Sequence, residues 1–170
     1  VEGLRDAKAA IRWVRQSAGE LGIDPDKIII SGLSAGGHLA TAAALVDGYE
    51  HQNEDTTISS RPDAVILWSA CVDPTVDTWF YYCLQGVDKP INLSPTHHIR
   101  PVHIPFLMFQ GTNDEFLDYQ THMTFRDKMK RAGNDCKLIL FEGVSHTQVY
   151  EQDMTDEYKK FISGHIENNK

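Results

Sequence analysis

The sequence is short of cysteine, of long apolar runs and of positive charge. Its three cysteines (Cys71, Cys83 and Cys136) are an odd number without C-x-x-C spacing, which argues against a disulfide framework and against a structural zinc site. No stretch approaches the roughly 18 consecutive apolar residues of a membrane span. Lysine and arginine number 16 against 24 aspartates and glutamates, which gives a net charge of −8. We therefore expect neither a membrane span nor a nucleic-acid partner.

The remaining composition is that of an ordinary globular domain, with 41% hydrophobic and 24% charged residues in a chain of 170. Short apolar runs predict strands at 27–31, 64–69, 104–110 and 137–141. The first of them, KIIIS, is typical of a strand buried on both faces of a parallel sheet. Helical spacing of apolar residues predicts helices at 4–21, 35–46, 119–132 and 149–166. This alternation predicts one α/β domain over residues 1–170, with a mostly parallel sheet and flanking helices.

A long connection, residues 72–103, separates the second and third predicted strands. Connections longer than about 15 residues are uncommon and often functional, although a parallel crossover itself needs about a dozen residues. The segment carries four aromatic residues in a row, WFYY at 79–82. We expect Trp79, Phe80 and Tyr82 to line a substrate pocket, with local packing as the alternative.

The motif G-x-S-x-G at 32–36 lies between a predicted strand and a predicted helix. In that context the serine occupies a tight, strained turn that exposes its hydroxyl at the carboxyl end of the sheet. Ser34 is therefore the predicted nucleophile. The N–H of the next residue, Ala35, opens the helix and is the predicted donor to an oxyanion formed there.

A serine nucleophile needs a base, and the base needs an acid to orient it. Asp114 and His146 follow the third and fourth predicted strands, in the Ser–Asp–His order of this architecture. Because parallel strands end at one edge of a sheet, Ser34, Asp114 and His146 are expected to converge there. Glu115 or Asp118 could serve in place of Asp114. The adjacent pair His97-His98 lacks supporting carboxylate spacing, so we expect no metal.

Several runs of residues carry a resemblance to a known family: DAKAAIRWVR at 6–15, LGIDPDKI at 21–28, GLSAGGHLA at 32–40, Ser94-Pro95 before His98-Ile99, GTND at 111–114 and GVSH at 143–146. Together they resemble the α/β-hydrolase esterase and lipase group, and most of all its acetyl-esterase and acetyl-xylan-esterase-like members. The resemblance implies the α/β-hydrolase fold, an ester-hydrolysing triad and no cofactor.

The chain also departs from that family. The fold usually has eight strands, and the four predicted here correspond to strands five to eight. The His-Gly-Gly run that completes the oxyanion hole in such esterases is absent, since the only Gly-Gly is Gly36-Gly37. We therefore expect the chain to be the C-terminal portion of a longer enzyme. Its first strand should then expose an apolar edge and support self-association into a homo-oligomer.

The resulting hypothesis is a serine carboxylic-ester hydrolase that acts on short-chain, acetyl-type esters through an acyl-enzyme on Ser34. Its partner is then a small-molecule ester. Two alternatives stay open at this point. One is a serine exopeptidase of the same fold, because a triad alone does not separate amides from esters. The other is a catalytically weak or inactive fragment that acts as a structural or interaction module.

Overall fold

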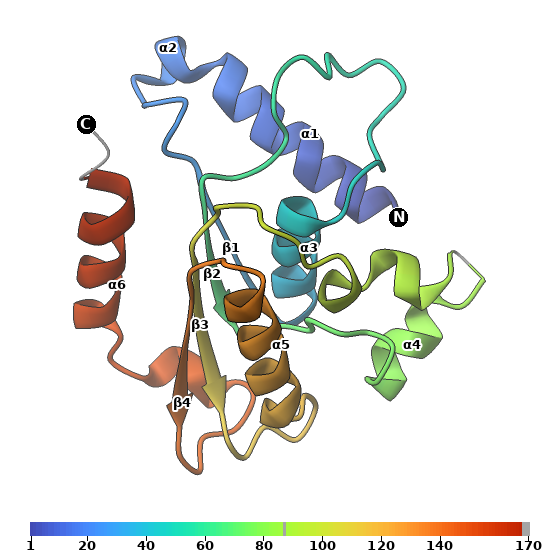
Figure 1. Ribbon diagram of the computed structural model, residues 1–170, viewed down its shortest axis with the longest axis vertical. Helices are drawn as coiled ribbons and strands as arrows, with labels where there is room; N and C mark the ends of the chain where they lie inside the picture. The colour runs from blue at the N-terminus through green and yellow to red at the C-terminus, as the bar shows by residue number, and fades with distance from the viewer. Residues whose placement is uncertain (87, 168–170) are drawn as a thin grey trace.

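The computed structural model describes residues 1–86 and 88–167, and its centre is a four-stranded, wholly parallel sheet (Figure 1). The strands are β1 (Ile29–Leu33), β2 (Ala64–Trp68), β3 (Phe106–Gly111) and β4 (Cys136–Phe141). They lie side by side in the order β1-β2-β3-β4. The predicted α/β class and parallel sheet are confirmed. All four strands end at one edge, where the loops that follow them meet.

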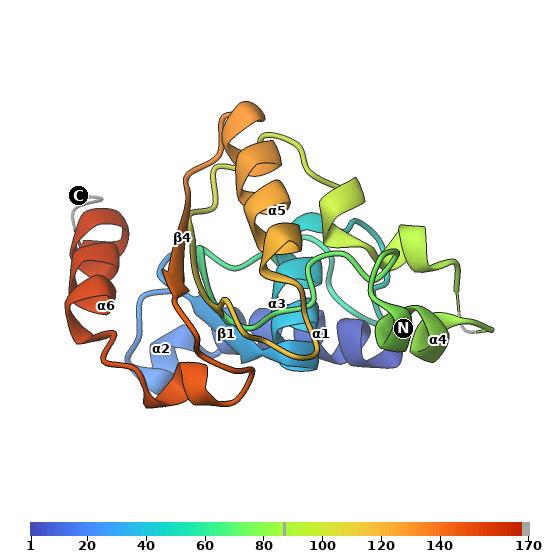
Figure 2. The same ribbon diagram turned by 90° about the horizontal axis from the view of Figure 1, so that it is seen from below.

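Helices cover both faces of the sheet (Figure 2). The helices α3 (Ser34–Leu45) and α5 (Tyr119–Arg131) pack on one face, where Leu45 and Phe125 join the apolar side chains of β2 and β3. The helix α6 (Thr155–Ile162) packs on the other face through Phe161. Helix α1 (Glu2–Gln16) packs against α3, and Ile30 of β1 joins the apolar cluster between them.

The first strand differs from its prediction. β2 and β3 are buried along nearly their whole length, but β1 is only half-buried, and Ser31 within it is exposed. The prediction that this apolar run is buried on both faces was therefore wrong. The reason is its place in the sheet, since in the described part of the chain β1 pairs with β2 alone.

Two predicted helices are interrupted. The first ends at Gln16 and resumes as the short α2 (Ala18–Leu21). The predicted helix 149–166 begins instead as a 3₁₀ turn, Gln148–Glu151, before α6 starts at Thr155. The carboxylate of Asp153 accepts a hydrogen bond from the Thr155 N–H at 3.0 Å. A local bond of this kind offers the backbone an alternative to a continuous helix, and it separates the two segments.

The long connection after β2 has structure of its own. It contains α4 (Thr78–Leu84) and two 3₁₀ turns, Pro90–Leu93 and Pro95–His97. Figures 1 and 2 show α4 standing away from the sheet, on the far side of α3. Asp77 caps α4 by accepting a hydrogen bond from the Phe80 N–H at 2.7 Å. No helix among the described residues is long and apolar enough to cross a membrane.

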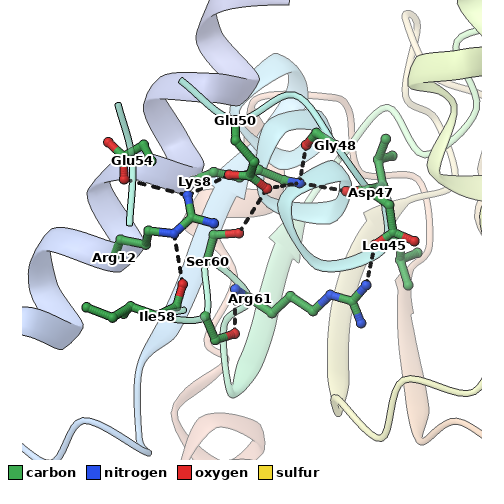
Figure 3. A network of polar contacts seen from close by, with 12 residues as sticks. Lys8, Arg12, Leu45, Asp47, Gly48, Glu50, Glu54, Ile58, Ser60 and Arg61 are labelled. Carbon is green, nitrogen blue, oxygen red and sulfur yellow. Dashed lines mark hydrogen bonds and ion pairs between the residues drawn. The ribbon is translucent and has the colours of Figure 1, made fainter. Parts of the chain in front are cut away.

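A polar network ties the loop between α3 and β2 to α1 (Figure 3). The side chains of Lys8 and Arg12 are only 4% exposed, and both bind the carboxylate of Glu50, at 3.0 Å and 2.6 Å. Lys8 also donates to the Val46 carbonyl at 2.8 Å, and Arg12 to the Ile58 carbonyl at 2.8 Å. The network therefore fixes both ends of this loop against the helix.

Candidate active site

Ser34 occupies the sharp turn between β1 and α3. Its φ of 50° lies in the left-handed region, which is strained for a residue with a side chain. Two neighbouring glycines permit the turn. A Cβ on Gly32 would lie 2.3 Å from the backbone of Gly36, and one on Gly37 would lie 2.4 Å from the Ala70 Cβ. Gly36 itself has nothing within 4 Å of such an atom. The close contacts are therefore made by Gly32 and Gly37.

The structure brings Asp114 and His146 into direct contact. His146 Nδ1 lies 3.0 Å from Asp114 Oδ1 and 2.9 Å from Oδ2. The Asp114 side chain is fully buried, and that of His146 is 9% exposed. A carboxylate accepts hydrogen bonds only, so Nδ1 carries the proton in this pair. The other nitrogen, Nε2, is then free to accept one.

Asp114 is held in its charged form by four groups. Oδ1 accepts from the Phe116 and Leu117 N–H groups, and Oδ2 accepts from Gln110 at 2.8 Å. Burial alone would raise the pKa of this carboxyl, but the hydrogen bonds from Leu117, His146, Phe116 and Gln110 outweigh it and lower the pKa below its usual value. Asp114 is therefore an ionised partner for the imidazole.

The loops that carry this pair are joined to each other. The Asn113 N–H donates to the Val144 carbonyl at 3.1 Å. A Cβ on Gly111 would lie 2.0 Å from that same carbonyl oxygen, so only glycine allows this approach. Glu115 accepts a hydrogen bond from the His146 backbone N–H at 3.2 Å rather than from its ring. Asp118 caps α5. Among the three candidate acids, only Asp114 contacts the imidazole.

Ser34 lies at the same edge of the sheet, after β1. The loop after β2 connects the two halves of the site, because the Cys71 N–H donates to the Ser34 carbonyl at 3.3 Å and Ser69 Oγ donates to the His146 carbonyl at 3.4 Å. Ser34 Oγ makes no hydrogen bond to a described residue. Ala35 is exposed in the first turn of α3, where backbone N–H groups have no acceptor within the helix.

A cavity of about 320 Å³ lies next to Glu115 and Phe116, which both contact His146, although neither His146 nor Ser34 is part of its lining. Its walls come from segments 70–79 and 115–122, and Trp79 is part of them. Phe80 is buried behind Trp79, with ring centroids 4.9 Å apart, and Tyr82 lines a separate hollow. The structure therefore places one of the three predicted pocket aromatics on this cavity. In the described part of the chain, no group of three or more acidic, histidine or cysteine residues could hold a metal.

Two residues of the site had no part in the sequence prediction. Gln110 is the one polar side chain in the apolar strand FLMFQ, and that contrast is the signal that could have found it. Phe116 stands edge-on to the His146 ring, with centroids 5.2 Å apart. An aromatic residue two positions after an acid carries no such signal.

Comparison with known proteins finds one family model and several ester hydrolases that are similar to this chain. The family model described as BD-FAE matches residues 2–78. Esterase 2 of Thermogutta terrifontis, phosphoramylated by tabun, is 38% identical with a TM-score of 0.86, over 95% of this chain and 63% of that one. A probable isoprenylcysteine alpha-carbonyl methylesterase of Arabidopsis thaliana is 27% identical over 88% of this chain and 36% of its own length. The probable carboxylic ester hydrolase LipM of Mycobacterium tuberculosis is 29% identical over 75% and 33%.

The parallel sheet, the strained serine at its edge and these matches define an α/β-hydrolase. The chain is similar to esterases of that superfamily, and its residues 2–78 match the BD-FAE family model. It spans 63% of the Thermogutta esterase and 36% of the Arabidopsis methylesterase. The recognition made from the sequence motifs is confirmed.

Proposed function

We propose that this chain is a serine carboxylic-ester hydrolase with Ser34, Asp114 and His146 as its catalytic triad. The observation that carries the proposal is the buried Asp114–His146 pair at the same sheet edge as a serine with a φ of 50°. A strained serine and an oriented imidazole are what acyl transfer requires of a protein. The chain acts as one α/β-hydrolase domain, in which segment 72–103 contributes part of the substrate pocket.

The proposed reaction uses these three residues in turn. His146 Nε2 takes the Ser34 proton as Oγ attacks the ester carbonyl, while Asp114 stabilises the imidazolium through Nδ1–H. The Ala35 N–H donates to the oxyanion of the tetrahedral intermediate. His146 then returns the proton to the departing alcohol, which leaves an acyl-enzyme on Ser34. Water, activated by the same histidine, releases the acid. No cofactor takes part in these steps.

The proposed acyl group is short. Esterase 2 of Thermogutta terrifontis has been solved with propionate and with butyrate bound, and it is 38% and 36% identical to this chain in those structures. A cavity of about 320 Å³ suits an ester of similar size. Acetyl-type esters are therefore the first substrates to test.

The test is hydrolysis of p-nitrophenyl acetate by the chain and by Ser34→Ala, with Ser17→Ala as the matched control. Ser17 lies between α1 and α2, away from the sheet edge. We expect turnover in the parent chain and in the control, loss of turnover in Ser34→Ala, and labelling of Ser34 alone by a fluorophosphonate. Equal rates in all three proteins would refute the nucleophile. A folded chain that neither turns over nor reacts with the probe would favour the structural or interaction module.

A second copy of the chain is the other proposed partner. Among the described residues, the outer edge of β1 has no partner strand and lies beside half-buried isoleucines, and such an edge favours pairing between chains. The proposal is therefore a homo-oligomer joined through β1.

A further inference from the structure

The cavity beside His146 has a wall chemistry that suits one kind of substrate. We propose that it binds a cationic group, such as a quaternary ammonium, in the alcohol part of the ester. This inference rests on the proposed esterase function and adds a substrate class to it.

The charge of the wall is of one sign. Four carboxylates line the cavity, namely Asp73, Asp77, Glu115 and Asp118, and its lining includes no lysine or arginine. His122 also lines it and is 1% exposed. Burial lowers the pKa of His122 to about 4, so this ring is neutral at physiological pH. A concave site of one charge concentrates counter-ions and repels ions of its own sign.

The innermost carboxylate is fixed in place. Asp73 is 7% exposed, and its Oδ1 accepts hydrogen bonds from the Thr75 N–H, the Thr75 hydroxyl and the Ser94 hydroxyl, at 3.1 Å, 2.6 Å and 3.0 Å. Its second oxygen, Oδ2, makes no hydrogen bond to a described residue. Among the described residues that line the cavity, only His122 Nε2 is a buried side-chain atom without a hydrogen-bond partner. A buried polar atom without a partner is costly unless something else satisfies it. Asp73 Oδ2 is not buried in this way, and because Oδ1 is held by three hydrogen bonds, Oδ2 offers an oriented negative charge to a bound ligand.

Two exposed aromatic rings complete the wall. Trp79 is 65% and Phe116 is 66% exposed, and both line the cavity. An aromatic face attracts a cation, and proteins bind quaternary ammonium groups with aromatic rings. The carboxylates of the wall add attraction for the same positive charge. A neutral polyol would make use of the carboxylates but gain little from two rings at the rim. The combination therefore favours a cation over a sugar hydroxyl group.

The position of the cavity assigns it to the alcohol. Phe116 and Glu115 line it and also touch His146, through the ring contact at 5.2 Å and the hydrogen bond at 3.2 Å. His146 is the group that returns a proton to the departing alcohol. The alcohol therefore leaves on the side of the site where the carboxylates are.

The test compares acetylcholine with 3,3-dimethylbutyl acetate, which has the same shape but carries carbon in place of the charged nitrogen. We expect kcat/KM to be about tenfold higher for acetylcholine at low ionic strength, and the ratio to fall as salt screens the carboxylates. A ratio at or below one overturns the proposal. Faster turnover of a monoacetylated methyl glucoside than of acetylcholine also overturns it, and assigns the cavity to a polyol.

Variants identify the groups responsible. In Asp73→Asn, and in the double variant Asp77→Asn with Glu115→Gln, the ratio of the two substrates should fall towards one. The double variant is the safeguard if Asp73→Asn does not fold, because Asp77 and Glu115 are less buried. Asp156→Asn, an exposed change on α6 on the opposite face of the sheet, removes the same charge and should keep the parent ratio. An unchanged ratio in both cavity variants refutes the assignment.

A binding measurement separates this inference from the proposed function. Choline and 3,3-dimethylbutanol are titrated into the chain while the indole resonance of Trp79, assigned with Trp79→Phe, is followed by NMR. Tighter binding of choline supports the cavity assignment even in a chain that hydrolyses nothing, and equal or weaker binding refutes it. If Ser34→Ala hydrolyses both esters at the parent rate, the proposed triad fails, whatever the cavity binds.

Discussion

At the scale of single residues, hydrogen-bond donors around Asp114 stabilise the charged form of its carboxylate. Its lowered pKa means that the ionised group favours the folded chain at any pH above the unfolded-state pKa of about 3.9. This contribution is lost as the pH falls through the lowered folded-state value. We expect Asp114→Asn to reduce the free energy of unfolding by about 2 kcal/mol at neutral pH, since it replaces hydrogen bonds to a charged acceptor. Urea denaturation of both proteins as a function of pH measures the difference.

The difference between wild type and Asp114→Asn should shrink as the pH is lowered below about 4, because both proteins then carry a neutral side chain at position 114. A difference that stays constant down to pH values near 2 would show that the stabilisation does not come from the charge. Asp156→Asn, which replaces an exposed carboxylate on α6, is the control and should show no such pH dependence.

The glycines of the nucleophile turn offer a matched pair of substitutions. Gly32→Ala places a Cβ 2.3 Å from the Gly36 backbone, which cannot yield, whereas Gly36→Ala meets nothing within 4 Å. We expect Gly32→Ala to lower the free energy of unfolding by about 3 kcal/mol or to prevent folding, by analogy with overpacking. Gly36→Ala lies inside α3 and should be neutral or stabilising by about 0.5–1 kcal/mol. Thermal unfolding measures the stability of the two variants. An equal loss of stability in both would show that the close contact at Gly32 is not the cause.

Some residues of the site could be predicted because their pattern encodes backbone geometry. The glycines around Ser34 mark the tight turn, and the positions of Asp114 and His146 after successive strands mark the sheet edge. Phe116, and the cavity carboxylates Asp73 and Asp77, could not be found in this way. The proximity of Phe116 to His146 depends on how two loops pack against each other, through the Gly111–Val144 approach, and local sequence does not encode that packing.

At the scale of elements, the loop 46–63 is held by buried charges on α1. Removing one partner of such a network leaves uncompensated charge in a buried place. We expect Glu50→Gln to lower the free energy of unfolding by about 2–3 kcal/mol, because Lys8 and Arg12 then lose their shared carboxylate. The exposed pair of Arg5 with Glu2 is the control, and Glu2→Gln should cost less than about 0.5 kcal/mol. Chemical denaturation of the two variants compares them, and a similar small loss in both would show that the network does not stabilise the loop.

The order and type of the main elements followed from hydrophobic spacing, and the sheet class followed from their alternation. Two features of the structure could not be predicted from hydrophobic spacing. Periodicity alone extended a helix over 149–166, although the Asp153 side chain interrupts it by accepting a hydrogen bond from the Thr155 N–H. The apolar run of β1 was read as doubly buried, because a sequence does not state how many neighbours a strand has. Local hydrogen bonds and position in the sheet lie outside what spacing can show.

At the scale of the whole molecule, the open edge of β1 predicts association between copies. Its backbone groups on that side have no partner strand among the described residues, and its isoleucines are half-buried. A charged side chain on such an edge opposes pairing. We expect the apparent mass in light scattering to rise with concentration in the tens of micromolar, and Ser31→Lys to return the chain to a monomer.

The control for that substitution must add the same charge elsewhere. Gln16→Lys does so at the exposed end of α1, away from the strand, and should associate as the parent chain does. If Gln16→Lys also becomes monomeric, net charge rather than the edge governs association. If the parent chain stays monomeric over the whole concentration range, the edge of β1 does not pair. If that monomer is also active, one copy of the chain contains the complete site. Activity measured across the same concentrations therefore shows whether a second copy contributes to catalysis or only covers the strand.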